Sequence, residues 1–114
     1  MSQRDDQVSL RHALDAARNI VASSQGWKRD DLAPDDLQTL GIIRLLEVIG
    51  EAANAVSAQF KAAHPEVPWR QMVGLRNRLI HAYFDVNLDI VWDTMQGDIP
   101  ALIRVLEPLV ERPH

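Results

Sequence analysis

The longest helix that the sequence predicts is DLQTLGIIRLLEVIGEAANAVSAQFKAA, residues 36–63. An N-cap at Asp35 or Asp36 begins it, and His64 and Pro65 end it, because a residue that precedes proline is biased away from helical dihedrals. Its apolar residues cover more of the helix circumference than a single stripe. We therefore expect this helix to pack on two sides, one of which can be another subunit.

Two glycines, Gly41 and Gly50, lie inside this predicted helix. A glycine in a helix interior weakens the helix by about 1 kcal/mol relative to alanine. Close approach of a neighbouring backbone would explain both glycines, and so would a helix that merely tolerates them. Both explanations stay open on the sequence alone.

Helical periodicity also covers most of the remaining chain. Apolar residues recur at steps of three and four over about residues 6–23, and a third helix is predicted over about residues 68–84. A fourth helix begins near Asn87 or Asp89 and continues almost to the C-terminal end. No segment reads as a strand. The sequence therefore predicts an all-α fold, an antiparallel bundle of four to five helices whose last helix is kinked or split near Pro100.

The composition is typical of a globular protein with one domain, which would span residues 1–114. The chain has 12 Lys and Arg against 16 Asp and Glu, a net charge of -4, so any contact with nucleic acid must be local. It has no Cys, which excludes disulfides and cysteine nucleophiles. No apolar run approaches the roughly 18 residues that a membrane span needs. We therefore expect a cytoplasmic protein without membrane contact.

Arg76 lies among apolar residues when residues 69–84 are wound as one helix. A guanidinium at the centre of an apolar face needs an anion, because it cannot lose its proton and its desolvation is costly. One explanation is an ion pair with Glu47 or Glu51 that locks the bundle. The other is a phosphate bound at a cleft or a subunit interface. Both can hold together, since a glutamate can orient the arginine while other donors face a ligand.

His81 is the candidate for proton transfer, because imidazole is the side chain best suited to it near neutral pH. A lone histidine is nevertheless more often a surface or helix-end residue. On an ideal helix His81 lies about 140° from Arg76. The two therefore converge only if the helix loosens near its end or if two copies meet across a two-fold axis. The four histidines show no metal-ligand spacing, so no metal site is predicted.

The chain contains the motif RNRLIHAY at residues 76–83. In this motif Asn77 follows Arg76 directly, and His81 and Tyr83 come five and seven residues after Arg76. This motif resembles the signature of HEPN-domain proteins of the HepT type, toxins encoded beside a minimal nucleotidyltransferase (MNT) antitoxin. The likeness covers nearly the whole chain and is weakest over the first 35 residues. The other similar segments are IGEAAN at 49–54, VPWRQMVGL at 67–75, FDV at 84–86 and Trp92.

The resemblance implies a metal-independent endoribonuclease that needs no cofactor, with a homodimer whose two motifs line one cleft. His81 would be the general acid or base, Arg76 would hold the phosphate and stabilise its developing charge, and Asn77 would be a polar helper. Tyr83 matches the tyrosine that the MNT nucleotidyltransferase modifies with AMP in similar systems. This AMPylation would place negative charge at the cleft, repel RNA and so inhibit the ribonuclease. The two proteins would then be a toxin and its antitoxin.

Two further residues are expected to support such a site. Glu51, like Glu47, would orient Arg76, and Arg78 would belong to a modest basic rim, although scattered surface charges explain Arg78 as well. Two other functions stay open. One is a non-catalytic HEPN module that binds a nucleotide or a partner, and the other is a structural helical dimer in which Arg76 makes only an internal ion pair.

Overall fold

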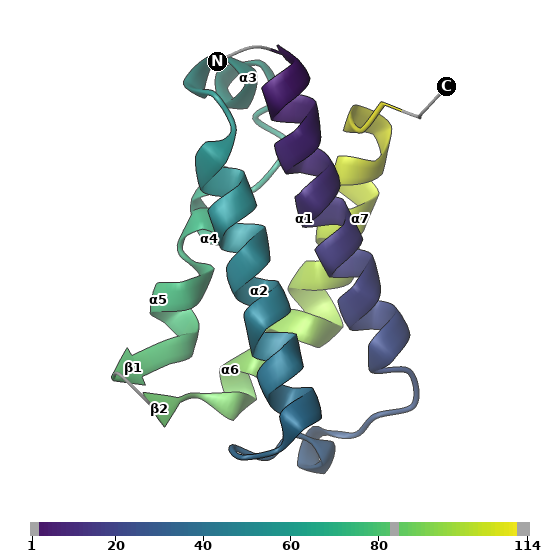
Figure 1. Cartoon of the computed structure of the whole chain (residues 1–114), viewed down its shortest axis with the longest axis vertical. Coiled ribbons are helices and arrows are strands. Elements are labelled where there is room, and N and C mark those ends of the chain that lie inside the picture. Colours follow the sequence, from purple (N-terminus) through teal and green to yellow (C-terminus); the bar gives the residue numbers. More distant parts are fainter. Residues whose placement is uncertain (1–2, 83–84, 112–114) are drawn as a thin grey trace.

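Two long helices, α1 (Gln3–Ser23) and α2 (Leu37–Ala55), lie side by side and antiparallel in the computed structural model (Figure 1). The structure describes residues 3–82 and 85–111. Helix α7 (Ile99–Leu106) packs against α1, and shorter helices pack against α2. The predicted all-α bundle is confirmed.

The apolar stripe predicted for the first helix forms part of the core. The core residues of α1 are less than one-tenth exposed and follow the helical period, and they meet the buried face of α2. The largest of them are Leu10, Leu14 and Ile20.

Among the described helices, none is both long and apolar enough to cross a membrane.

The prediction of one uninterrupted helix over residues 36–63 is wrong. Helix α2 ends at Ala55, and a separate short helix, α3 (Ala58–Ala63), follows it. The break lies at Ser57, whose hydroxyl caps α3 by accepting a hydrogen bond from the Phe60 N–H at 3.2 Å. Asp6 of α1 fixes the break, since its carboxylate accepts hydrogen bonds from the Ser57 N–H at 2.8 Å and hydroxyl at 2.7 Å. The start of α2 is as predicted, with Asp36 as its N-cap.

The two glycines of α2 have different roles. A Cβ atom on Gly50 would lie 3.0 Å from the carbonyl oxygen of Met72 and 3.7 Å from that of Val73. The absent side chain therefore lets the backbone that follows Trp69 approach α2 closely, as one of the two explanations predicted. A Cβ atom on Gly41 would meet nothing within 4 Å in the described chain, so close approach is wrong for this position.

The predicted third helix is divided and ends early. It consists of α4 (Trp69–Val73) and α5 (Leu75–Leu79), after which the chain forms the strand β1 (Ile80–Ala82). This strand pairs antiparallel with β2 (Asp85–Val86). The expectations that no segment forms a strand and that the helix continues to about residue 84 are both wrong.

Local chemistry explains this change from helix to strand. Gly74 separates α4 from α5, and β-branched Ile80 and Val86 pair across the two strands, where such side chains are favoured. The backbone N–H of Asn87 donates a hydrogen bond to the carbonyl oxygen of Leu79 at 2.8 Å. This bond closes the base of the two-stranded segment directly after α5.

The last helical segment is interrupted near Pro100, as the sequence predicts. Helix α6 (Leu88–Asp93) continues into a π-helical turn (Thr94–Asp98), and α7 begins with Pro100 in its first turn. The Thr94 hydroxyl donates to the carbonyl oxygen of Ile90 at 2.7 Å. A π-helical turn inserts an extra residue and is frequent at functional sites.

Candidate functional site

The candidate site residues lie on α5 and on the strand that follows it. Arg76, Asn77 and Arg78 belong to α5, and the backbone of His81 belongs to β1. Tyr83 lies outside the described residues. The loosening of the helix that would let Arg76 and His81 converge is therefore present, because the chain leaves the helical path at Ile80.

Arg76 is exposed and faces α2. Its side chain is 68% exposed, and its Nε atom lies 3.7 Å from the Oε2 atom of Glu47, whose side chain is 25% exposed. The expectation of a guanidinium at the centre of a buried face is wrong, because Gly74 and Ile80 break the single helix on which it rested. The predicted glutamate partner is present, but at this distance and exposure the pair contributes little stability.

Glu51 does not contact Arg76. Its Oε1 atom lies 3.1 Å from Nη1 of Arg44, and both side chains are more than half exposed. The two residues belong to α2 and lie two turns apart, so they share a side of this helix with Glu47. Glu47, and not Glu51, is therefore the glutamate that contacts Arg76, and Glu51 belongs to a neighbouring ion pair.

Arg78 extends to a different neighbour. Its Nη2 atom donates to Oδ2 of Asp98 at 3.1 Å and lies 3.3 Å from the Thr94 hydroxyl oxygen. Helix α5 therefore directs one arginine to α2 and another to the π-helical turn. The structure does not bring Arg78 into a common cluster with Arg76, and Asn77 lies exposed between them in the sequence.

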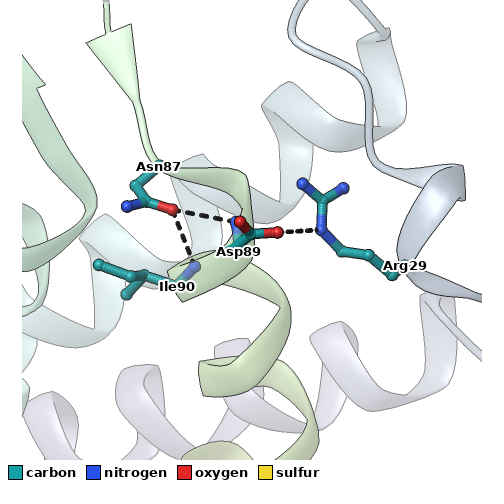
Figure 2. A network of polar contacts seen from close by, with 4 residues as sticks. All are labelled: Arg29, Asn87, Asp89 and Ile90. Atoms are coloured by element: carbon teal, nitrogen blue, oxygen red, sulfur yellow. Dashed lines mark hydrogen bonds and ion pairs between the residues drawn. The ribbon is translucent and has the colours of Figure 1, made fainter.

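A polar network that the sequence did not predict holds the chain just after β2 (Figure 2). The Asn87 side chain caps α6 by accepting from the N–H groups of Asp89 at 3.1 Å and Ile90 at 3.2 Å. The Asp89 carboxylate accepts from Nε of Arg29 at 2.8 Å, and Arg29 lies in the loop between α1 and α2. This network fixes the segment that returns from the strand bearing His81.

The face of α2 beside Arg76 carries exposed apolar side chains. Leu37 is 82% exposed and Leu40 is 48% exposed, and Val73 of α4 is also exposed. The two leucines precede Arg44 by seven and four residues, so they lie on the same side of α2.

Within the described residues, no group of three His, Asp or Glu side chains could hold a metal ion.

Comparison with known proteins agrees with the motif at residues 76–83. A model of one class of ribonucleases, described as Ribonuclease HepT-like, matches residues 11–109. The chain belongs to this HepT-like ribonuclease family, so the predicted resemblance is confirmed.

Individual relatives support the same class. "Probable ribonuclease HepT" of Thermococcus cleftensis is 44% identical over 80 residues, which cover 70% of this chain and 73% of the relative. "Putative RNase TTE0752" of Caldanaerobacter subterraneus subsp. tengcongensis is 33% identical over 103 residues, which cover 90% of this chain and 92% of the relative. No solved structure matches the chain with significant similarity.

Proposed function

We propose that this protein is a metal-independent endoribonuclease toxin, which works as a homodimer and is inhibited when an MNT nucleotidyltransferase partner AMPylates Tyr83. The observation that carries the proposal is the exposed Arg76, oriented by Glu47 and placed five residues before His81 in a chain of the HepT-like ribonuclease family. An exposed guanidinium with most of its donors directed to solvent suits a phosphate of RNA.

The proposed reaction is a transesterification within RNA. The ribose 2′-oxygen attacks the adjacent phosphorus, the bond from phosphorus to the 5′-oxygen breaks, and the products are a 2′,3′-cyclic phosphate and a 5′-hydroxyl end. His81 takes the proton from the 2′-hydroxyl or gives one to the leaving 5′-oxygen. Arg76 stabilises the negative charge that develops on the phosphate oxygens, and Asn77 offers a further donor beside it.

The exposed face of α2 supports a homodimer. Leu37 and Leu40 would be covered by a second copy, which removes apolar area from water. Arg44 and Glu51 carry opposite charges on the same side of α2, so this side can pair with a second copy of itself. If two α2 helices pack antiparallel across a two-fold axis, Arg44 of each copy faces Glu51 of the partner subunit.

The position of Glu47 connects this dimer to the site. Glu47 lies between Arg44 and Glu51 on the same side of α2, so a two-fold axis midway between them passes close to Glu47. Arg76, which contacts Glu47, would then lie beside the axis in both copies. Two arginines, each beside a Glu47, would then offer their remaining donors to one phosphate-binding cleft.

RNA cleavage in the presence of EDTA tests the proposed activity. We expect the purified protein to cut RNA without divalent metal and to leave 2′,3′-cyclic phosphate ends, and light scattering to show a dimer at micromolar concentration. The control for contaminating nuclease is His81→Ala purified in the same way. Equal cleavage by both proteins, or by neither, contradicts the nuclease proposal, and RNA binding without cleavage favours a non-catalytic binding module.

AMPylation of Tyr83 is tested by co-expression with the open reading frame that neighbours its gene, which we propose to encode the MNT nucleotidyltransferase. We expect the intact mass to increase by one or more AMP groups and RNA cleavage to fall, because each AMP adds a negative phosphate that repels the RNA backbone. The matched control is Tyr83→Phe, which keeps the ring and removes the hydroxyl. An unchanged mass of the wild-type protein, or the same increase in Tyr83→Phe, rejects Tyr83 as the modified residue.

A further inference from the structure

A cavity of about 430 Å³ lies on the side of α5 that faces the π-helical turn and α7. Roughly 300–1,000 Å³ is the usual range for clefts that bind small ligands. The lining of this cavity is mostly apolar, with Met72, Leu75 and Leu102 among its residues. Its polar groups include Arg78, Asp98 and Thr94. Glu66 and Gln71 also line it. An apolar cavity with a few polar groups in its lining suits a flat, partly polar ring.

The polar side of this cavity is an ion pair with unused capacity. Asp98 Oδ2 accepts from Nη2 of Arg78 at 3.1 Å, and their side chains are about half exposed. A carboxylate can accept about four hydrogen bonds and a guanidinium can donate five. Within the described residues, Asp98 has no other polar partner. A ligand can therefore bind both groups without separating the pair.

The order of donor and acceptor in this pair fits one nucleobase. The Watson–Crick edge of guanine presents an acceptor, O6, followed by two donors, the N1–H and the 2-amino group. Arg78 offers a donor for O6, and the adjacent Asp98 carboxylate offers acceptors for both donors. Adenine, cytosine and uracil do not place two neighbouring donors beside an acceptor. Single-stranded RNA is commonly recognised through such edges of unstacked bases.

We propose that the cavity between α5 and α7 is a base-binding subsite that selects guanine next to the scissile phosphate of an RNA substrate. This inference rests on the proposed ribonuclease function. Arg76 and Arg78 lie two residues apart on α5 and face different neighbours, so the helix separates the phosphate position from the base position. Residues 76–78 are all exposed, so a single RNA strand can follow this face of α5 from Arg76 past Asn77 to Arg78.

Nucleotide binding to His81→Ala tests the subsite without requiring RNA cleavage. The chain has three methionines, and Met72 lines the cavity whereas Met95 does not. In protein with 13C-methyl methionine, we expect GMP to shift the Met72 signal, assigned with Met72→Leu, and to leave the Met95 signal in place. AMP is expected to bind at least about tenfold more weakly, and IMP, which lacks the 2-amino group, to fall between them.

Three results overturn the proposal in this experiment. The first is equal binding of GMP and AMP, and the second is no shift of the Met72 signal with either nucleotide. The third is binding of GMP without binding of a short RNA that contains one guanine, which would make the cavity a site for free nucleotides. Binding of both guanine ligands supports the subsite even if the wild-type protein cleaves no RNA, so failure of the proposed function is distinguishable from failure of this inference.

The variant Asp98→Asn tests the named contact. Its amide keeps the shape of the side chain but replaces one acceptor by a donor, so we expect the preference for GMP over AMP to fall by about tenfold or more. The matched control is Asp93→Asn, which changes an exposed aspartate of the same helical segment outside the cavity and should leave the preference unchanged. An unchanged preference in Asp98→Asn, with the fold intact by circular dichroism, overturns the proposed contact.

Discussion

His81→Ala is expected to lower the rate of RNA cleavage by about 10²–10⁴-fold, the range that a general acid or base contributes. The methyl group of alanine can neither take the proton of the 2′-hydroxyl nor protonate the leaving 5′-oxygen. The measurement is the single-turnover rate on a defined RNA in EDTA, with RNA binding measured separately. Binding should change much less than the rate, because Arg76 still contacts the phosphate.

The matched control for this variant is His12→Ala. His12 is an exposed histidine of α1, away from α5 and β1, so its removal should leave the rate within about twofold of the wild type. A cleavage rate of His81→Ala equal to that of His12→Ala would remove His81 from the reaction.

Arg76→Ala is expected to separate activity from stability. Its only ion pair among the described residues is the 3.7 Å contact with Glu47, and its side chain is 68% exposed, so the free energy of unfolding should fall by less than about 1 kcal/mol. The cleavage rate should fall by about 10²–10³-fold, as when one donor to a developing negative charge is removed. Urea unfolding and the single-turnover rate measure the two effects on the same preparation.

Two further variants sharpen the interpretation of Arg76. Arg76→Lys keeps the charge but loses the planar fork of donors, so we expect a rate between those of the wild type and Arg76→Ala. Arg104→Ala removes an exposed arginine of α7 and is expected to change neither property. If Arg76→Ala instead loses several kcal/mol of stability, the ion pair with Glu47 is structural, and the helical-dimer explanation is the better one.

The sequence predicts those parts of the fold that depend on neighbouring residues. The apolar period of α1 and the cap at Asp36 act within a few residues, and both are present as predicted. The break at Ser57 depends on Asp6, which lies 51 residues away in the sequence. The contact of Arg29 with Asp89 spans 60 residues. Such contacts form only after the helices pack, so the local pattern does not reveal them.

In the candidate site, too, the sequence predicts the local features and misses those that depend on helix packing. The motif identifies Arg76 and its spacing to His81, but the prediction that Arg76 lies on an apolar face requires one continuous helix over residues 69–84. Gly74 and the change to a strand at Ile80 shift the residues on either side, which exposes Arg76. The choice between Glu47 and Glu51 depends on the level at which α5 crosses α2, which requires the packed structure.

The close approach at Gly50 also limits how this protein can move. Sliding of one packed helix along another is a common way to rearrange a binding site. Here the carbonyl oxygens of Met72 and Val73 lie against the backbone of α2 at Gly50, which leaves little freedom for α4 to shear along it. We therefore expect α4 to keep its position along α2 when a substrate binds, so that α5, which follows it directly, begins from an anchored point.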